Sequence, residues 1–212
     1  MVELYKGYTI AIEQDECAES PREWDNLGMM VCGHRQYNLG DKQIPDHYYN
    51  DDGEYIEITS MAEIKEWIEH TYGKPAIILP LGLYEHGGIT MYIGDTHDRW
   101  DGGAVGYVFV TKERIKKEYG VKRVTQKILT IAEETLRNEV KTYDYYLRGE
   151  VFGYSVEGVD SCWGYYSTDE AIAEAKNRID EHIKQQQRKK EAKLKQYITH
   201  SVPLEKRTFS NI

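Results

Sequence analysis

Apolar residues follow two kinds of spacing along this chain, one typical of strands and one typical of helices. Short runs rich in β-branched and aromatic residues predict strands. Two of these runs, 76–83 and 105–110, are continuously apolar and predict buried strands, and 89–93 alternates like a hairpin partner of the first. The predicted strands cover residues 3–13, 27–32, 55–58, 76–83, 89–93, 105–110 and 151–156.

Apolar residues three and four positions apart predict helices, and several have recognisable start signals. Ser60 with Glu63, and Ser167 with Glu170, have the spacing of capping boxes, while Thr125 can cap a third helix. A short basic segment, KERIKKEYG, predicts one more. The predicted helices follow Ser60, Thr125 and Ser167, and the short one covers residues 112–120.

The last helix changes character along its length. Ile172, Ala175, Ile179 and Ile183 form an apolar stripe, which predicts packing against a core. Beyond residue 184 the stripe is lost, so we expect a basic helix end in solvent. The last dozen residues are expected to be unanchored.

These elements predict an α+β fold. Strands come in hairpin-like runs and helices come separately, which favours an antiparallel or mixed sheet packed against two or three helices, with a long C-terminal helix. We expect an acidic α+β core over residues 1–166, followed by a C-terminal helix with a basic tail over residues 167–212.

Charge is distributed unevenly along the 212 residues. The net charge is −9, but Lys184 to the end has eight Lys or Arg against two Glu, whereas residues 1–183 have 19 against 34 acidic residues. Such an acidic body repels phosphate backbones and suits a basic partner surface. The 18 tyrosines add side chains that provide contact area at low entropic cost.

Cys17, Cys32 and Cys162 are widely spaced and form no CxxC pair, so we expect three free thiols packed as small apolar groups. No run is long enough to span a bilayer, and the first residues lack the pattern of a signal peptide. The expected location is the cytoplasm of a bacterial host cell.

Common catalytic signatures are absent from the sequence. There is no phosphate-binding GxxxxGK[ST] loop, no GxSxG elbow and no HExxH motif. The acidic loops at 46–57 and 95–101 do not place carboxylates at both ends of an EF-hand spacing. We therefore expect no cofactor and no assigned catalytic residue.

The stretch SPREWDNLGMMVCGHRQYNLGD, residues 20–41, places polar residues on both sides of an apolar strand. If 27–32 is a strand, its flanking polar pairs lie about 20 Å apart and cannot share one substrate atom. Asp25-Asn26 and 38–41 are then turn formers at its ends. His34 with Asp41, as a base and its orienting carboxylate, is the clearest functional exception.

Three other polar segments are candidates for chemistry. Glu85-His86 could bind a metal or move protons, and the 95–101 loop contains His97 among aspartates. As hairpin ends, 84–88 and 94–103 are expected at opposite ends of the sheet. Cys162, expected between the last strand and last helix, is a candidate low-pKa thiol or, more simply, a buried residue beside a packed Trp163.

Four blocks of sequence also carry a resemblance. SPREWDNLGMMVCGHRQYNLGD, LPLGLYEHGGITMYIG, GAVGYVFVTKE and LRGEVFGY with DSCWGYY resemble a largely uncharacterised family of small proteins of phages, prophages and plasmids of Gram-positive bacteria, over most of residues 10–166. The resemblance implies an accessory protein of a mobile element, a class that often inhibits host defence, including anti-CRISPR and anti-restriction proteins. No catalytic residue is carried over from it, and the basic C-terminal extension departs from it.

The preferred hypothesis is a non-enzymatic protein that binds and inhibits a bacterial defence effector that handles nucleic acid. An acidic, tyrosine-rich surface would occupy a basic nucleic-acid channel. The expected contact residues lie in the two acidic loops: Tyr48, Tyr49, Asp51, Asp52, Glu54, Tyr55, Asp95, Asp98, Trp100 and Asp101.

Two alternatives remain open. One is a metal-dependent hydrolase acting on a nucleotide or nucleic acid, with His34, Asp41, His86 or His97 as metal ligands or bases. The other is a nucleic-acid binder that works through Lys184–Lys195.

Overall fold

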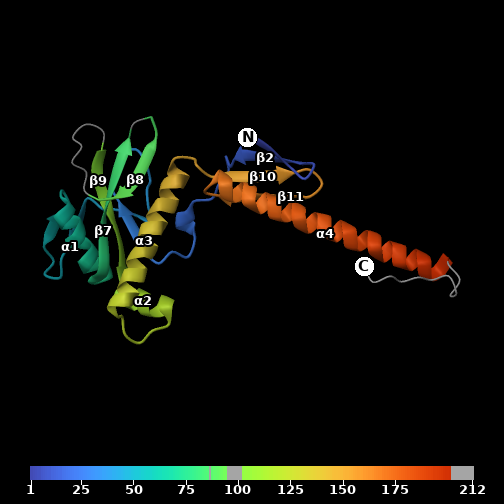
Figure 1. Cartoon of the computed structure of the whole chain (residues 1–212). Coiled ribbons are helices and arrows are strands. Elements are labelled where there is room, and N and C mark those ends of the chain that lie inside the picture. Colours follow the sequence, from blue (N-terminus) through green and yellow to red (C-terminus); the bar gives the residue numbers. More distant parts are fainter. Residues whose placement is uncertain (86, 95–101, 202–212) are drawn as a thin grey trace. The chain divides into compact units, whose positions relative to one another are not determined.

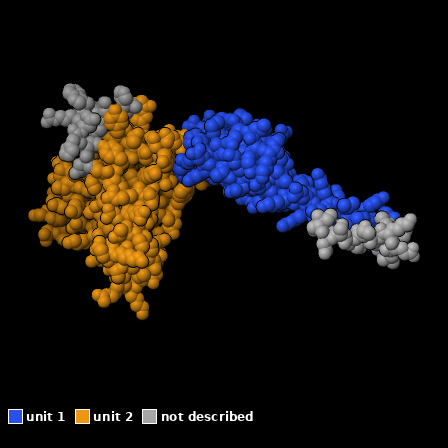
Figure 2. Space-filling view, in the orientation of Figure 1, with its two compact units in different colours: residues 1–16, 151–212 blue, residues 17–150 orange. Residues whose placement is uncertain are grey.

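The computed structural model describes residues 1–85, 87–94 and 102–201, and it divides the chain into two compact units. Unit 2 is residues 17–150, and unit 1 combines residues 1–16 with 151–212 (Figure 2). The predicted division at residue 166 differs from this one. The reason is strand pairing, because β2 (Tyr8–Gln14) pairs with β10 (Phe152–Val156) and so joins both chain ends in one sheet.

A five-stranded mixed sheet forms the centre of unit 2. Its order is β4-β3-β9-β7-β8, antiparallel except for the short β3–β4 pair. Strands β7, β8 and β9 are labelled in Figure 1. The strands are β3 (Met29–Cys32), β4 (Lys42–Gln43), β7 (Pro75–Glu85), β8 (Ile89–Ile93) and β9 (Gly102–Thr111).

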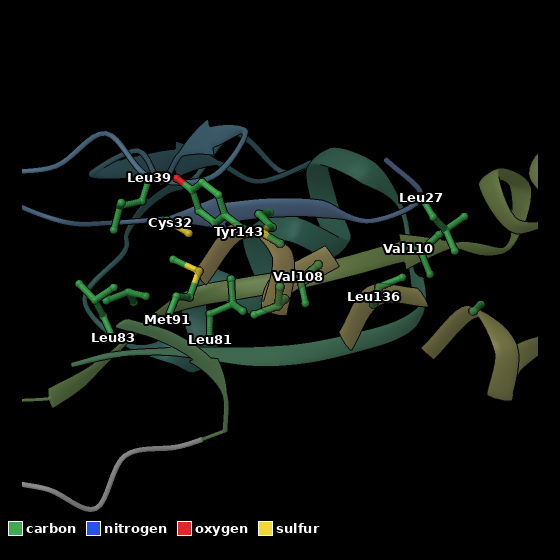
Figure 3. Packing of buried hydrophobic residues seen from close by; sticks show 14 of the residues in the cluster. Leu27, Cys32, Leu39, Leu81, Leu83, Met91, Val108, Val110, Leu136 and Tyr143 are labelled. Atoms are coloured by element: carbon green, nitrogen blue, oxygen red, sulfur yellow. The ribbon is translucent and has the colours of Figure 1, made fainter. Parts of the chain in front are cut away.

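Helices cover both faces of this sheet. On one face Met30, Val108 and Val110 pack with Leu136 and other residues of α3 (Gln126–Leu147), in the core shown in Figure 3. On the other face the intervening residues Val31 and Phe109 pack with Trp67 and Ile68 of α1 (Met61–Tyr72). Burial on both faces explains why β7 and β9 read as continuous apolar runs.

The helices of unit 2 begin where the sequence predicts. The Ser60–Glu63 capping box is formed at α1, and the Thr125 hydroxyl accepts the backbone N–H of Ile128 at α3. The Thr111 side chain caps α2 (Lys112–Tyr119), which ends at a left-handed Gly120.

Unit 1 is a four-stranded antiparallel sheet, ordered β1-β2-β10-β11, with one helix on one face. Ile10, Ile12 and Tyr154 are buried against Ala175 and Ile179 of α4 (Thr168–Ser201). The strands not yet described are β1 (Val2–Tyr5) and β11 (Asp160–Tyr165). The α+β class and the long C-terminal helix are confirmed.

Two strand predictions are wrong in unit 1. Residues 3–13 are two strands, β1 and β2, joined by a tight turn in which Lys6 and Gly7 have φ of 51° and 85°. Asp160–Tyr165 is a further strand rather than a connection to the last helix, and its exposed face hides the alternation on which strand prediction depends.

Unit 2 also contains a two-stranded sheet, which begins within the predicted loop 40–54 and ends at residue 57. It is the hairpin of β5 (His47–Tyr49) and β6 (Tyr55–Glu57). A short 3-10 helix, η1 (Pro21–Glu23), precedes β3. None of the helices in the described part of the chain is both long and apolar enough to cross a membrane.

Candidate functional site

The β5–β6 hairpin sorts its side chains onto two faces. Its register pairs His47 with Glu57, Tyr48 with Ile56, and Tyr49 with Tyr55. Because side chains alternate along a strand, the first and third pairs share one face, and Tyr48 and Ile56 share the other. Tyr48 packs with the α1 core cluster, so its face is the inner one.

The outer face carries a cluster of three exposed rings. His47 stacks on Tyr55 with ring centroids 4.7 Å apart, and Tyr49 meets Tyr55 edge to face at 5.9 Å. Tyr49 and Tyr55 remain 60% and 57% exposed. Large aromatic side chains that are this exposed and already held in place are typical anchors of protein interfaces.

Carboxylates are concentrated in the hairpin and in α1. Residues 46–69 contain eight Asp or Glu and one Lys, which accounts for the whole net charge of −7 in unit 2. The acidic residues are Asp46, Asp51, Asp52, Glu54, Glu57, Glu63, Glu66 and Glu69. We call the exposed rings of His47, Tyr49 and Tyr55 with the carboxylates of residues 46–57 the acidic hairpin surface.

The hairpin is held in one conformation by its turn. The Asn50 side-chain oxygen accepts the backbone N–H groups of Asp52 and Glu54 at 3.1 and 2.9 Å. Its amide nitrogen donates to a Glu54 carboxylate oxygen at 2.9 Å. At the hairpin's base, the N–H of Ile58 donates to the Asp46 carbonyl. A surface fixed before binding loses less conformational entropy when a partner docks.

Contacts to α1 hold the inner side of the hairpin. The Tyr48 ring lies 5.2 Å from the His70 ring, and His70 Nε2 lies 3.1 Å from the Asp51 carboxylate. Burial raises the pKa of Tyr48, with smaller contributions from Glu66 and Glu63. Tyr48 is therefore a packing residue, and Tyr49 and Tyr55 are the accessible tyrosines of the predicted set.

The predicted contact residues of the first acidic loop lie together in one hairpin. Those of the second acidic loop lie outside the described part of the chain. Tyr48, Tyr49, Asp51, Asp52, Glu54 and Tyr55 all belong to the hairpin or its turn. Asp95, Asp98, Trp100 and Asp101 lie outside the described residues, as do His86 and His97. His47 was missed, although its position two residues before Tyr49 indicates the same strand face.

Residues of the 20–41 stretch form a partly buried ionic network with α3. Arg22, whose side chain is 5% exposed, donates from Nε and Nη2 to the two oxygens of Asp41 at 2.9 and 2.6 Å. Nη2 also donates to the Gly28 carbonyl, and Nη1 lies 3.5 Å from Glu139 of α3. Asp41 is thus a structural carboxylate.

Glu139 completes this network from α3. Its carboxylate accepts the backbone N–H groups of Leu27 and Gly28 at 2.7 and 3.1 Å. Burial raises its pKa, while these two bonds and Arg22 act in the opposite direction. Together these bonds hold the segment before β3 against α3. Arg22, Asp41 and Glu139 therefore have a structural role around the start of β3.

His34 does not join Asp41. Its Nδ1 accepts the backbone N–H groups of Gln36 and Tyr37, its ring stacks on Tyr37, and its Nε2 lies 3.9 Å from Glu85. The pairing of His34 with Asp41 as a base and its orienter is thus not formed. Among residues 1–85, 87–94 and 102–201, no three His, Cys, Asp or Glu side chains are grouped to hold a metal ion.

All three cysteines are free thiols, as expected, but only one of them is packed. Cys32 is buried, and burial raises its pKa to about 12, but Cys17 and Cys162 are exposed. Cys162 lies within β11 and is exposed, so its interpretation as a buried residue is wrong. Trp163, next to it, is 46% exposed and its ring covers Gly153.

A surface pocket in unit 2 was not anticipated from the sequence. Its volume is about 540 Å³, and Trp24, Tyr72, Phe109 and Arg114 line it together with the start of β3. Arg114 is held there by Asp25 at 2.7 Å and by the Asn26 carbonyl at 3.0 Å. The pocket combines separate parts of the chain, and no local sequence pattern indicates it.

Comparison with known proteins gives no match: no protein-family model, no curated protein and no solved structure is similar to this chain.

Proposed function

We propose that this chain is a non-enzymatic accessory protein of a mobile element that binds and inhibits a bacterial defence effector acting on nucleic acid, of the anti-CRISPR or anti-restriction type. The observation that carries the proposal is the acidic hairpin surface. It combines exposed aromatic side chains with the carboxylates of residues 46–57, on a hairpin held by hydrogen bonds in its turn and by packing against α1.

The chemistry of this surface favours a basic partner. A groove that binds nucleic acid is lined by Lys and Arg side chains. The carboxylates of the acidic hairpin surface would attract these cations and speed association. Tyr49 and Tyr55 would then enter the partner's surface, where desolvated aromatic side chains contribute most of the affinity. An occupied channel excludes its nucleic acid, so binding itself would be the inhibitory step.

Affinity purification tests the proposal. The tagged chain is used as bait in a bacterial host with an active defence system, and the captured proteins are identified. We expect a nucleic-acid-handling effector, whose nuclease activity the purified chain inhibits in vitro. Recovery of no such effector, or of one whose activity is unchanged, would contradict the proposal.

Two matched variants locate the surface. Tyr49→Ala with Tyr55→Ala should reduce capture at least tenfold, whereas Tyr197→Ala, an equally exposed tyrosine on α4, should not. Asp52→Asn with Glu57→Gln should slow association and weaken its dependence on salt, whereas Glu113→Gln with Glu134→Gln should leave both unchanged. An equal effect of either test variant and its own control would contradict the assignment to the hairpin.

A further inference from the structure

The second half of α4 extends beyond the core of unit 1 (Figures 1 and 2). Ile183 is its last residue in a hydrophobic cluster, and from residue 184 to 201 all residues except Ile198 are exposed. At a rise of 1.5 Å per residue this segment is about 27 Å long. We call residues 184–201 the exposed segment of α4.

The exposed segment is built to remain helical without packing. From 184 to 197 it consists of Lys, Arg, Gln, Glu, Ala and Leu, with Tyr197 as the single exception, and these six are strong helix formers. Asp180 precedes Lys184 by four residues and Glu191 precedes Lys195 by four, the order of charges that supports a helix. A helix maintained by propensity in solvent presents its side chains in fixed directions.

Positive charge dominates this segment. It has six Lys or Arg and one Glu, and the six are Lys184, Arg188, Lys189, Lys190, Lys193 and Lys195. Asp180 lies near Lys184. For the other five cations, no ion pair is formed with a carboxylate of the described residues. These charges are therefore available to an external anion.

The cations lie on well-separated sides of the helix. At 3.6 residues per turn, Arg188 and Lys195 point in one direction, and Lys189 and Lys193 point more than a quarter turn away. A helix that lies on a membrane needs one continuous apolar face, which this segment lacks. A helix in the major groove of DNA has a phosphate backbone on each side.

We propose that the exposed segment of α4 binds duplex DNA, with the helix in the major groove and its cations on the flanking phosphates. The DNA major groove is wide enough for an α-helix, whereas the major groove of duplex RNA is too narrow for side chains to enter. With no base-reading residues assigned, the binding is to the backbone and is independent of sequence. The proposal stands apart from the inhibitory function, since it concerns the opposite charge on the other unit.

Fluorescence anisotropy with a labelled DNA duplex of arbitrary sequence tests the proposal on the full chain. The test variant replaces Arg188, Lys189, Lys190, Lys193 and Lys195 with Gln, which keeps helix propensity. Each phosphate contact contributes about 0.9 to the slope of log affinity against log salt, so this variant should flatten the slope by up to about 4.5. At low salt we expect at least tenfold weaker binding.

The control variant removes the same charge from unit 2. Lys112, Lys117, Lys122, Arg123 and Lys127 are exposed cations in and after α2, and their replacement with Gln should leave DNA binding within about twofold. An equal loss in both variants would show a net-charge effect and overturn the proposal. Far-UV circular dichroism of each variant checks that α4 remains helical.

Other outcomes also overturn it. The proposal is overturned if the chain binds no duplex DNA at low salt. It is also overturned if the chain prefers duplex RNA or phosphatidylglycerol vesicles to duplex DNA. Salt-sensitive self-association that requires both the five cations and Asp52 with Glu57 would assign the segment to the acidic hairpin surface of a second copy. Preference for duplex DNA, lost only in the α4 variant, supports it whatever the outcome of the effector capture.

Discussion

The two units differ in how much of each sheet is covered. In unit 2, α1 and α3 bury opposite faces of the sheet, and an ionic network around Arg22 holds the segment before β3 against α3. In unit 1, one helix covers one face, and Val2 and Leu4 of β1 remain 70% and 74% exposed. Unit 2 therefore has the larger core, and the β5–β6 hairpin packs against part of it. In unit 1, only the first half of α4 packs against the core.

The charges of the two units differ in the same way. Unit 2 gathers its excess carboxylates at one hairpin and helix, and unit 1 gathers cations on the helix segment that leaves its core. Both groups lie where few apolar contacts constrain the choice of residue. Residues needed for folding and residues available for binding are therefore separate in each unit.

The largest effect is expected from Arg22→Met in unit 2. It leaves Asp41 and Glu139 partly buried without their shared cation, which should lower the free energy of unfolding by about 3–5 kcal/mol. Hydrogen exchange in urea, read separately for peptides of each unit, measures this loss and should show it in unit 2. The control is Arg137→Met, which removes an exposed pair with Glu133 and should cost about 0.3–0.5 kcal/mol. A loss below 1 kcal/mol for Arg22→Met would contradict the structural role.

Glycines in the two sheets should respond differently to alanine. At Gly106, φ is 155° and an added Cβ would lie 1.9 Å from the Val31 carbonyl oxygen, so Gly106→Ala should cost about 3 kcal/mol or more. At Gly153 the added Cβ meets the Trp163 ring at 2.1 Å, with an expected cost of about 1–3 kcal/mol. A double-mutant cycle with Trp163→Ala should recover part of the second cost, because a side chain can be removed and a backbone carbonyl cannot. Additive effects at Gly153 and Trp163 would show that the ring contact is unimportant.

Buried carboxyl groups of unit 2 and a surface-paired carboxyl group of unit 1 should have pKa values shifted in opposite directions. In unit 2, burial raises the pKa of Glu139 above 4.5 and that of Asp144 above 3.8. In unit 1, the hydrogen bond from Lys6 lowers the pKa of Asp180 below 3.8. Carboxyl ¹³C NMR measures each value directly.

These shifts have consequences of opposite sign for stability. The ionised forms of Glu139 and Asp144 oppose folding at neutral pH, and that cost is relieved as pH falls through their raised pKa values. Asp180 stabilises unit 1 above pH 3.8, and its contribution is lost as pH falls through its lowered pKa. Shifts of the same sign in both units would contradict the contrast between burial and surface pairing.

The smallest effect is expected from shortening α4. A chain ending at Gln187 keeps Ile183 and one further turn, so the free energy of unfolding of unit 1 should change by less than about 0.5 kcal/mol. Urea unfolding of the shortened and full chains gives the comparison. A larger loss would mean that residues after Gln187 contribute to the fold of unit 1.

Local patterns predicted the helices well. The Ser60–Glu63 box, Thr125 and the stripe ending at Ile183 each depend on neighbours within one or two turns, and the structure confirms them. The tyrosines and carboxylates of 46–57 were also identified as a group, because they are adjacent in sequence. Their arrangement as a two-stranded hairpin was not predicted, since three-residue strands are too short to show a period.

Register and strand order were less predictable. The segments 84–88 and 94–103 were expected at opposite ends of the sheet, but β9 pairs with the other edge of β7, and Gly103 lies opposite Leu83. The β1–β2 hairpin was missed because the two-residue turn at Lys6 and Gly7 interrupts the apolar pattern only weakly. Strand β11 was missed because its exposed residues show no apolar alternation.

The sequence by itself determined where the helices begin, the α+β class, and where charge and tyrosine gather, because these depend on residues close along the chain. Only the tertiary structure decided that Asp41 serves Arg22 and not His34, that Tyr49 and Tyr55 are exposed while Tyr48 is packed, and that α4 leaves its core after Ile183. Those outcomes depend on which distant segments pack together, and packing selects among partners that are equally compatible with the local sequence.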